Sequence, residues 1–219
     1  MGAPLDAKPN LGDRSVGSRL GRHVALWIAA VVALSLAACG NGNGSSESPS
    51  TTSGESSSSE PSSSSVALLP RDAIISLSTV KEILPEMTQE TATGPNQTVV
   101  GNPTANRAVT YASTDGSQRA VISVDQYKSS EEASSAYQEA SQMSQEVPGV
   151  TGSETVPDLG DGAFIGVVTQ GDETHVGGGA LYGELIVTAT LQGYEGTEEN
   201  KDKVIELLNE QGDTAQQAL

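Results

Sequence analysis

The chain has 219 residues and a formal net charge of −17 at pH 7, with 28 acidic residues against 11 Lys and Arg. A surface this acidic repels phosphate backbones, so we expect no nucleic-acid partner. Aromatic residues make up only 3% of the chain, which predicts a core of Val, Ile, Leu and Ala. The single cysteine, Cys39, excludes a scaffold of intramolecular disulfides.

A targeting signal is predicted at the N-terminus. Basic residues between positions 14 and 22 precede an apolar run at 24–38. This run has the length of a signal-peptide core and is short for a membrane span. The run and the residue after it end in Leu36, Ala37, Ala38 and Cys39.

These four residues resemble the lipobox of bacterial lipoproteins, in which Leu and two small residues precede the modified Cys. The resemblance implies that residues 1–38 are a signal peptide and that Cys39 carries a diacylglyceryl group. It also implies that the mature chain is anchored to the outer face of the cytoplasmic membrane. Each buried CH₂ contributes about 0.8 kcal/mol, so two or three acyl chains anchor a protein stably. An ordinary secretory signal or an uncleaved anchor is the alternative.

Residues 39–65 consist of Cys39 and a stretch rich in Ser, Gly and Pro that has no hydrophobic residue. Such a composition cannot bury enough apolar surface to offset chain entropy, which predicts a disordered linker. Its r.m.s. reach is on the order of 25–30 Å. The linker would hold the domain off the membrane or let it reach through a wall layer. Residues 66–219 then form a single extracytoplasmic domain of ordinary size.

The first elements of this domain are a helix and a hairpin. A short helix is predicted within 77–87, where Thr79 and Glu82 have capping-box spacing. Two strand-like runs follow at 105–113 and 118–126. An Asp-Gly pair lies between them, and this is a strong hairpin signal.

The remaining elements alternate in type. Residues 129–145 predict an amphipathic helix that begins at a capping box of Ser129 and Glu132. Three strand-like runs follow at 163–169, 174–181 and 184–191. A final helix is predicted at 198–211, with Gly212 as its C-cap.

Together these elements predict an α+β fold, with a mainly antiparallel sheet of about five strands and helices packed on one face. The helix that begins at Ser129, the segment 156–164 and the strand 185–189 are similar in order and character to small actinobacterial envelope lipoproteins. They are similar also to related extracellular sensor-like domains. This resemblance spans 121–208 and implies location and fold. Some of those relatives carry disulfides that this chain cannot form, so their binding cleft is not carried over.

Residues that carry chemistry are few. His175 is the only histidine after the signal, and no Gly-x-Ser-x-Gly elbow accompanies it, so we interpret it as a surface or strand residue. Asp158 and Asp161 lack the spacing of a calcium loop and indicate a turn. Gly177-Gly178-Gly179 lacks the Lys of a phosphate loop and indicates a bulged or close-packed strand. We therefore expect no catalytic residue, metal or cofactor.

Three functional hypotheses remain. The first is a non-enzymatic binding or sensor-type module that is anchored to the membrane and recognises an envelope protein or a small ligand. The second is a carrier of an apolar envelope lipid in an internal cavity, because few large aromatic side chains are present to fill the interior. The third is a hydrolase, which would require His175 beside a Ser and an acid.

Overall fold

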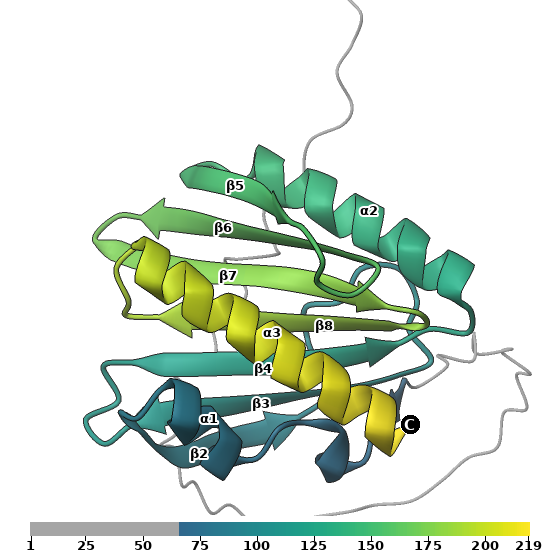
Figure 1. The fold of residues 1–219 in the computed structure, drawn as a ribbon, viewed down its shortest axis with the longest axis horizontal. Coiled ribbons are helices and arrows are strands. Elements are labelled where there is room, and N and C mark those ends of the chain that lie inside the picture. Colours follow the sequence, from purple (N-terminus) through teal and green to yellow (C-terminus); the bar gives the residue numbers. More distant parts are fainter. Residues whose placement is uncertain (1–65) are drawn as a thin grey trace, which may run out of the picture.

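The computed structural model describes residues 66–219. The predicted signal peptide, the anchor at Cys39 and the linker at 39–65 lie outside the described residues. The described part contains three α-helices, one turn of 3-10 helix and an eight-stranded sheet (Figure 1). The helices are α1 (Leu77–Ile83), α2 (Ser130–Glu146) and α3 (Glu198–Ala218), and the 3-10 turn is η2 (Arg71–Ala73). The strands are β1 (Ala67–Leu68), β2 (Met87–Gly94), β3 (Ala105–Ser113), β4 (Arg119–Gln126), β5 (Val150–Val156), β6 (Gly162–Gln170), β7 (Glu173–Tyr182) and β8 (Leu185–Gln192).

The sheet has the strand order β1-β3-β4-β8-β7-β6-β5, and β2 also pairs with β3. Every pair is antiparallel except β1 with β3. The predicted α+β class and mainly antiparallel sheet are confirmed, but the expected number of about five strands is too low. The additional strands are β1, β2 and β5, which pair along the two edges of the sheet. Because β2 and β5 are largely exposed, their sequences lack the apolar alternation that indicates a strand.

Helices cover both faces of the sheet, so the prediction that they pack on one face is wrong. In β7, Ala180 and Tyr182 belong to the large core that includes α3, whereas Leu181 packs with α2. Neighbouring residues of a strand point to opposite faces, and the two helices therefore lie on opposite sides of the sheet. We call these the α3 face and the α2 face. Figure 1 shows α3 crossing in front of the sheet.

Serine and threonine side chains cap the helices. Ser129 accepts a hydrogen bond from the backbone N–H of Glu132 at 3.3 Å, which confirms the predicted start of α2. In α1 the cap is Ser76, which accepts from the N–H of Thr79, so the predicted capping box at Thr79 is wrong. The negative charges in the first turn of α3 complement the helix dipole.

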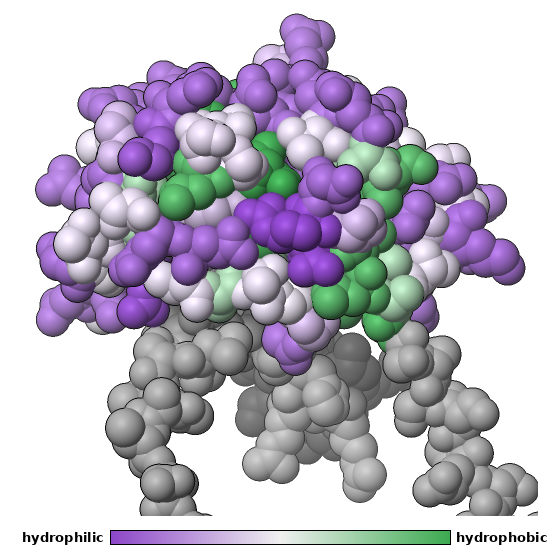
Figure 2. All heavy atoms as spheres, turned by 90° about the horizontal axis from the view of Figure 1, so that it is seen from below, coloured by the Kyte–Doolittle hydropathy of each residue, from purple (hydrophilic) through white to green (hydrophobic). Residues whose placement is uncertain are grey.

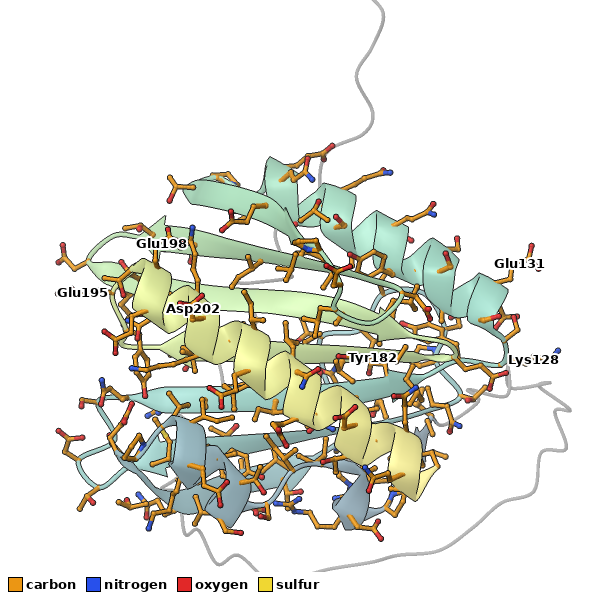
Figure 3. The ribbon with its side chains drawn as sticks, in the orientation of Figure 1. Lys128, Glu131, Tyr182, Glu195, Glu198 and Asp202 are labelled. Atoms are coloured by element: carbon orange, nitrogen blue, oxygen red, sulfur yellow. The ribbon has the colours of Figure 1, made fainter. Side chains whose placement is uncertain are left out.

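The last helix continues past Gly212 to Ala218, so the predicted C-cap is wrong. Gly212 is buried inside α3, and a Cβ atom there would overlap the ring of Tyr182. Figure 3 shows Tyr182 beneath α3. Its hydroxyl donates to the carbonyl of Leu208 at 3.3 Å. Gly212 is required for this close approach rather than for a turn.

The outer surface is hydrophilic over most of the face in Figure 2, with smaller apolar patches between polar side chains. The exposed large apolar side chains of residues 66–219 are Val66, Leu68 and Leu219. No helix in the described part combines the length and the apolar character that crossing a membrane requires.

We predict that Gly212→Ala destabilises the protein, although alanine is the better helix former by about 1 kcal/mol. The added methyl group overlaps the Tyr182 ring, and overpacking of this kind costs about 1–3 kcal/mol of unfolding free energy. Denaturant unfolding measures the change. The exposed position Gln216 of the same helix supplies the control, since Gln216→Ala should leave stability nearly unchanged. A Gly212→Ala variant more stable than wild type would contradict the close packing.

Candidate binding groove on the α2 face

The α2 face of the sheet is only partly covered. α2 packs over Leu181 and Ile186 at one end of β7 and β8. The connection between β2 and β3 also lies on this face, where the Asn96 side chain reaches Ser123 and Asp125 of β4. An open groove of about 90 Å³ remains between them, and we call it the sheet groove. Its walls come from α2, β5 and the β2–β3 connection.

The floor of the sheet groove is a cross-strand row of small side chains. Gly166, Gly177, Thr190 and Val121 lie directly opposite one another on β6, β7, β8 and β4. We call this the glycine row. A Cβ atom at Gly166 would be in ordinary van der Waals contact with Ser153 and Val150, at 3.7–4.0 Å, whereas one at Gly177 would lie 2.9 Å from the Thr190 hydroxyl oxygen. At this level the floor of the groove is formed by two adjacent strands that carry no side chain.

The next row along the strands carries polar nitrogen atoms. Val168, His175, Gln192 and Arg119 lie opposite one another on the same four strands, and we call this the histidine row. His175 is only 5% exposed and lines the sheet groove. Neither of its ring nitrogens has a hydrogen-bond partner in the described part of the chain. The buried Nε2 of Gln192 also has none there.

His175 is neutral at physiological pH. Burial lowers the pKa of the imidazole below its ordinary value, and the Glu173 carboxylate offsets this only in part. The distance between His175 Nε2 and Glu173 Oε2 is 3.8 Å, too long for a hydrogen bond. A neutral imidazole has one donor and one acceptor. Burying such groups without hydrogen-bond partners costs about 1–3 kcal/mol of folding free energy each. The buried imidazole therefore does not stabilise the fold.

A buried polar network borders the other side of the groove. Asp125 is 1% exposed, and Asn96 Nδ2 donates to both of its carboxylate oxygens at 3.0 Å. Burial raises the pKa of Asp125 to about 7, although the hydrogen bond from Asn96 opposes this. Asn96 also donates to Ser123, whose hydroxyl lies 2.7 Å from that of Thr188. These bonds fix the β2–β3 connection against the sheet.

The residues that the sequence singled out have different outcomes. Leu36, Ala37, Ala38 and Cys39, the predicted lipobox, lie outside the described residues. His175 is a strand residue, as one of the two interpretations had it, but it is buried beside a groove rather than on the surface.

The two aspartates and the three glycines have structural roles. Asp161 accepts the backbone N–H of Gly183 at 2.7 Å, which supports the interpretation of Asp158 and Asp161 as parts of a turn. Residues 66–219 contain no group of three His, Cys, Asp or Glu side chains that could hold a metal ion. The glycines 177–179 form a close-packed strand, since a Cβ at Gly179 would lie 3.2 Å from the Phe164 ring.

The sequence did not indicate four polar residues that belong to the two rows or to the network beside them. They are Asn96, Ser123, Asp125 and Gln192. One signal was present. In β4 and β8 apolar residues alternate with polar ones, so that Ser123 and Thr188 share one face. Such alternation shows that the second face is polar but not which residues it brings together.

The geometry of the groove bears on the hydrolase and lipid-carrier hypotheses. His175 has no hydrogen bond to a serine hydroxyl within the described part, and the nearby Glu173 side chain is 67% exposed. A dry apolar cavity of about 150 Å³ holds benzene. The sheet groove is smaller and open, so it holds an apolar group of a few carbons and encloses no acyl chain.

We predict that Asp125→Asn changes the pH dependence of stability. The folded protein keeps a proton on Asp125 up to about pH 7, whereas the unfolded chain releases it near pH 4. The unfolding free energy of the wild-type protein therefore falls as pH rises between these two values. Over that range the unfolding free energy of the variant should rise by a few kcal/mol relative to that of the wild type, and urea unfolding at each pH measures the difference. Asp172→Asn is the control for the loss of one carboxylate. If Asp125→Asn and the wild type had the same dependence of stability on pH, the raised pKa of the buried Asp125 carboxyl would be contradicted.

We predict that His175→Leu stabilises the protein by about 1–3 kcal/mol at pH 7, because it removes buried polar groups without partners. The gain should widen as pH falls toward 5, since the unfolded chain takes up a proton that the buried imidazole resists. Guanidinium unfolding measures both effects. The matched control is His175→Gln, which keeps a buried polar group and should give no gain. If leucine destabilised the fold, the imidazole would have a stabilising partner after all.

Comparison with known proteins gives a likeness of fold. The sequence matches no family model and none of the curated proteins. The extracellular domain of PknH from Mycobacterium tuberculosis is similar in structure, with a TM-score of 0.50 at 9% identity over 64% of this chain and 93% of that one. A GTP binding regulator from Thermotoga maritima gives a TM-score of 0.35 at 13% identity over 65% of this chain and 93% of the other. At these identities the likeness to PknH is one of fold alone.

Proposed function

We propose that the chain is a lipid-anchored extracytoplasmic binding module that takes a small ligand in the sheet groove and performs no catalysis. The observation that carries the proposal is the buried imidazole of His175, which borders a floor of two glycines and has no partner in the described part. Positions that forgo stability are typical of binding sites. A ligand that supplied hydrogen bonds to these nitrogens would recover the lost stability.

Three features support the location. The lipobox-like residues before Cys39 follow an apolar run of signal-peptide length. The linker gives the domain reach from a membrane, and the acidic surface favours solubility. The PknH structure with a similar fold is described as an extracellular domain.

A non-catalytic role is supported by the surroundings of the one imidazole. A nucleophilic mechanism needs a hydroxyl or thiol within hydrogen-bond reach of the base. Within residues 66–219, His175 makes no hydrogen bond to a hydroxyl or thiol. The groove can therefore orient and desolvate a ligand, and we assign it to binding.

The anchor is tested by Cys39→Ala. Without the thiol no diacylglyceryl group can be attached, so the variant should leave the membrane fraction, whereas the wild type should stay in it after a high-salt wash. Fractionation and immunoblotting of the expressing bacterium measure the distribution. Ser45→Ala, in the predicted linker, serves as the control. A Cys39→Ala protein that stayed membrane-bound in high salt would exclude the lipid anchor.

The groove is tested by filling its floor. Gly166→Val adds a Cβ atom at ordinary contact distance from Ser153 and Val150 and two methyl groups at the floor of the groove, so we expect the fold to remain intact while ligand binding is lost. Gly94→Val is the control, because Gly94 is a strand residue with open space beside its Cα and is not among the residues that line the groove. The measurement is the thermal shift of the full chain with a panel of short carboxylic acids, amides and amines. If no molecule of the panel gave a thermal shift that disappeared in Gly166→Val, this result would count against the groove as a binding site.

A further inference from the structure

A second hollow adjoins the sheet groove at His175, and we call it the polar pocket. It has a volume of about 510 Å³ and is lined by the ends of β4, β7 and β8 together with the turns beside them. This volume falls within the range of about 300–1,000 Å³ that is typical of small-ligand sites. His175 lines both hollows, so the histidine row lies where they meet.

The deep part of the polar pocket presents nitrogen atoms. His175 and Gln192 are cross-strand partners, and Gln192 is also the partner of Arg119. Directly opposite residues have Cβ atoms about 4.5–5.5 Å apart, so the three side chains form one short row. All the buried side-chain atoms without a partner in the described part are nitrogens of His175 and Gln192. The Arg119 guanidinium, at the end of the row, has no ion pair within residues 66–219.

Donors that lie side by side require an acceptor, and a carboxylate fits this row best. A carboxylate offers two oxygens to N–H groups, and its charge strengthens bonds from a guanidinium. The acidic side chains of the pocket, Asp172, Glu173 and Glu195, are exposed at its rim. Figure 3 places Glu195 where β8 leads into α3, at the end of the sheet. A rim of negative charge disfavours a phosphate, which carries more charge than a carboxylate.

The sheet groove has room for the hydrocarbon part of such a ligand. From the carboxylate position, the glycine row lies on the other side of His175 and is bordered by Val168 and Phe164. About 90 Å³ of mostly apolar space accommodates a short or branched chain of a few carbons.

We infer that the histidine row binds the carboxylate of a small apolar monocarboxylic acid, whose hydrocarbon part lies on the Gly166–Gly177 floor. The inference rests on the proposed function and specifies the chemistry of its ligand. His175 and Gln192 donate to the carboxylate oxygens, Arg119 supplies the opposite charge, and Glu173 opposes binding because it places a second negative charge next to His175. Glu173 thereby provides a test of the sign of the ligand charge.

The experiment is calorimetric titration of the full chain with isovalerate, the uncharged isovaleramide and the cationic isoamylamine. We expect binding of isovalerate alone, weakened about tenfold or more in Arg119→Gln and in Gln192→Leu. Glu173→Gln should tighten isovalerate binding by roughly twofold to fivefold. Asp172→Asn removes the same charge from the neighbouring position and should change the affinity less than Glu173→Gln does.

An NMR titration of the histidine side chains gives an independent readout. Isovalerate should raise the pKa of His175, because a bound carboxylate favours the charged imidazole, and isovaleramide should not. His175 is the only histidine after the predicted signal, so its imidazole signals in the mature chain are identified without further assignment.

Three results would overturn the inference: equal affinity for acid and amide, weaker binding in Glu173→Gln, or no binding of isovalerate at about 10 mM, which would reveal a millimolar Kd. If another panel molecule bound in a Gly166-dependent way, the proposed function would stand and only the carboxylate assignment would fail.

Discussion

The register of the four central strands is the constraint on which both faces of the molecule depend. Side chains alternate along a strand, so a slip of one residue between β7 and its neighbours would exchange the two faces. In the observed register Val176 and Ala180 enter the core beneath α3, while His175 and Gly177 turn to the α2 face. The register is strongly specified, because the α3 face of these strands is mostly apolar and its apolar side chains are buried.

The two faces differ in what they contribute. The α3 face supplies most of the buried apolar area and, with it, the main part of the stability. The α2 face is divided between a smaller apolar cluster, a polar network and an open groove. Because one face already holds the sheet together, the other can carry glycines and an imidazole that has no hydrogen-bond partner within residues 66–219.

The polar network gives the groove a defined border. Asn96 is held in two directions, by Asp125 and Ser123 on β4 and by Asn106 on β3, whose side chain accepts the N–H of Asn96 at 3.1 Å. A connection of ten residues without regular structure is thereby attached to the sheet at its first turn. Tyr127 attaches it again farther on, where its hydroxyl donates to the carbonyl of Val100 at 2.6 Å. A rigid border of this kind lowers the entropic cost of binding, because the wall is in place before the ligand arrives.

Local elements with strong periodic signals could be predicted from the sequence. The bounds of β3 and the cap of α2 could be read from alternation and from Ser129, and the Asp-Gly turn identified the first hairpin. The edge strands β2 and β5 were missed because a strand paired on one side and exposed on both faces needs no apolar pattern. The end of α3 was misplaced because glycine at a helix end and glycine under an aromatic ring look alike in a sequence.

The candidate site, in contrast, depends on strand pairing that the sequence does not reveal. His175, Gln192 and Arg119 are far apart along the chain and become neighbours through pairing of β7, β8 and β4. Neither hollow has a sequence motif, because each is lined by residues of several elements that are far apart along the chain. The targeting signal and the lipobox resemblance, by contrast, depend on contiguous residues that are recognised as extended chain, so the sequence was sufficient to predict them. Local interactions are encoded in neighbouring residues, whereas the depth, burial and charge of a site depend on which distant residues the fold brings together.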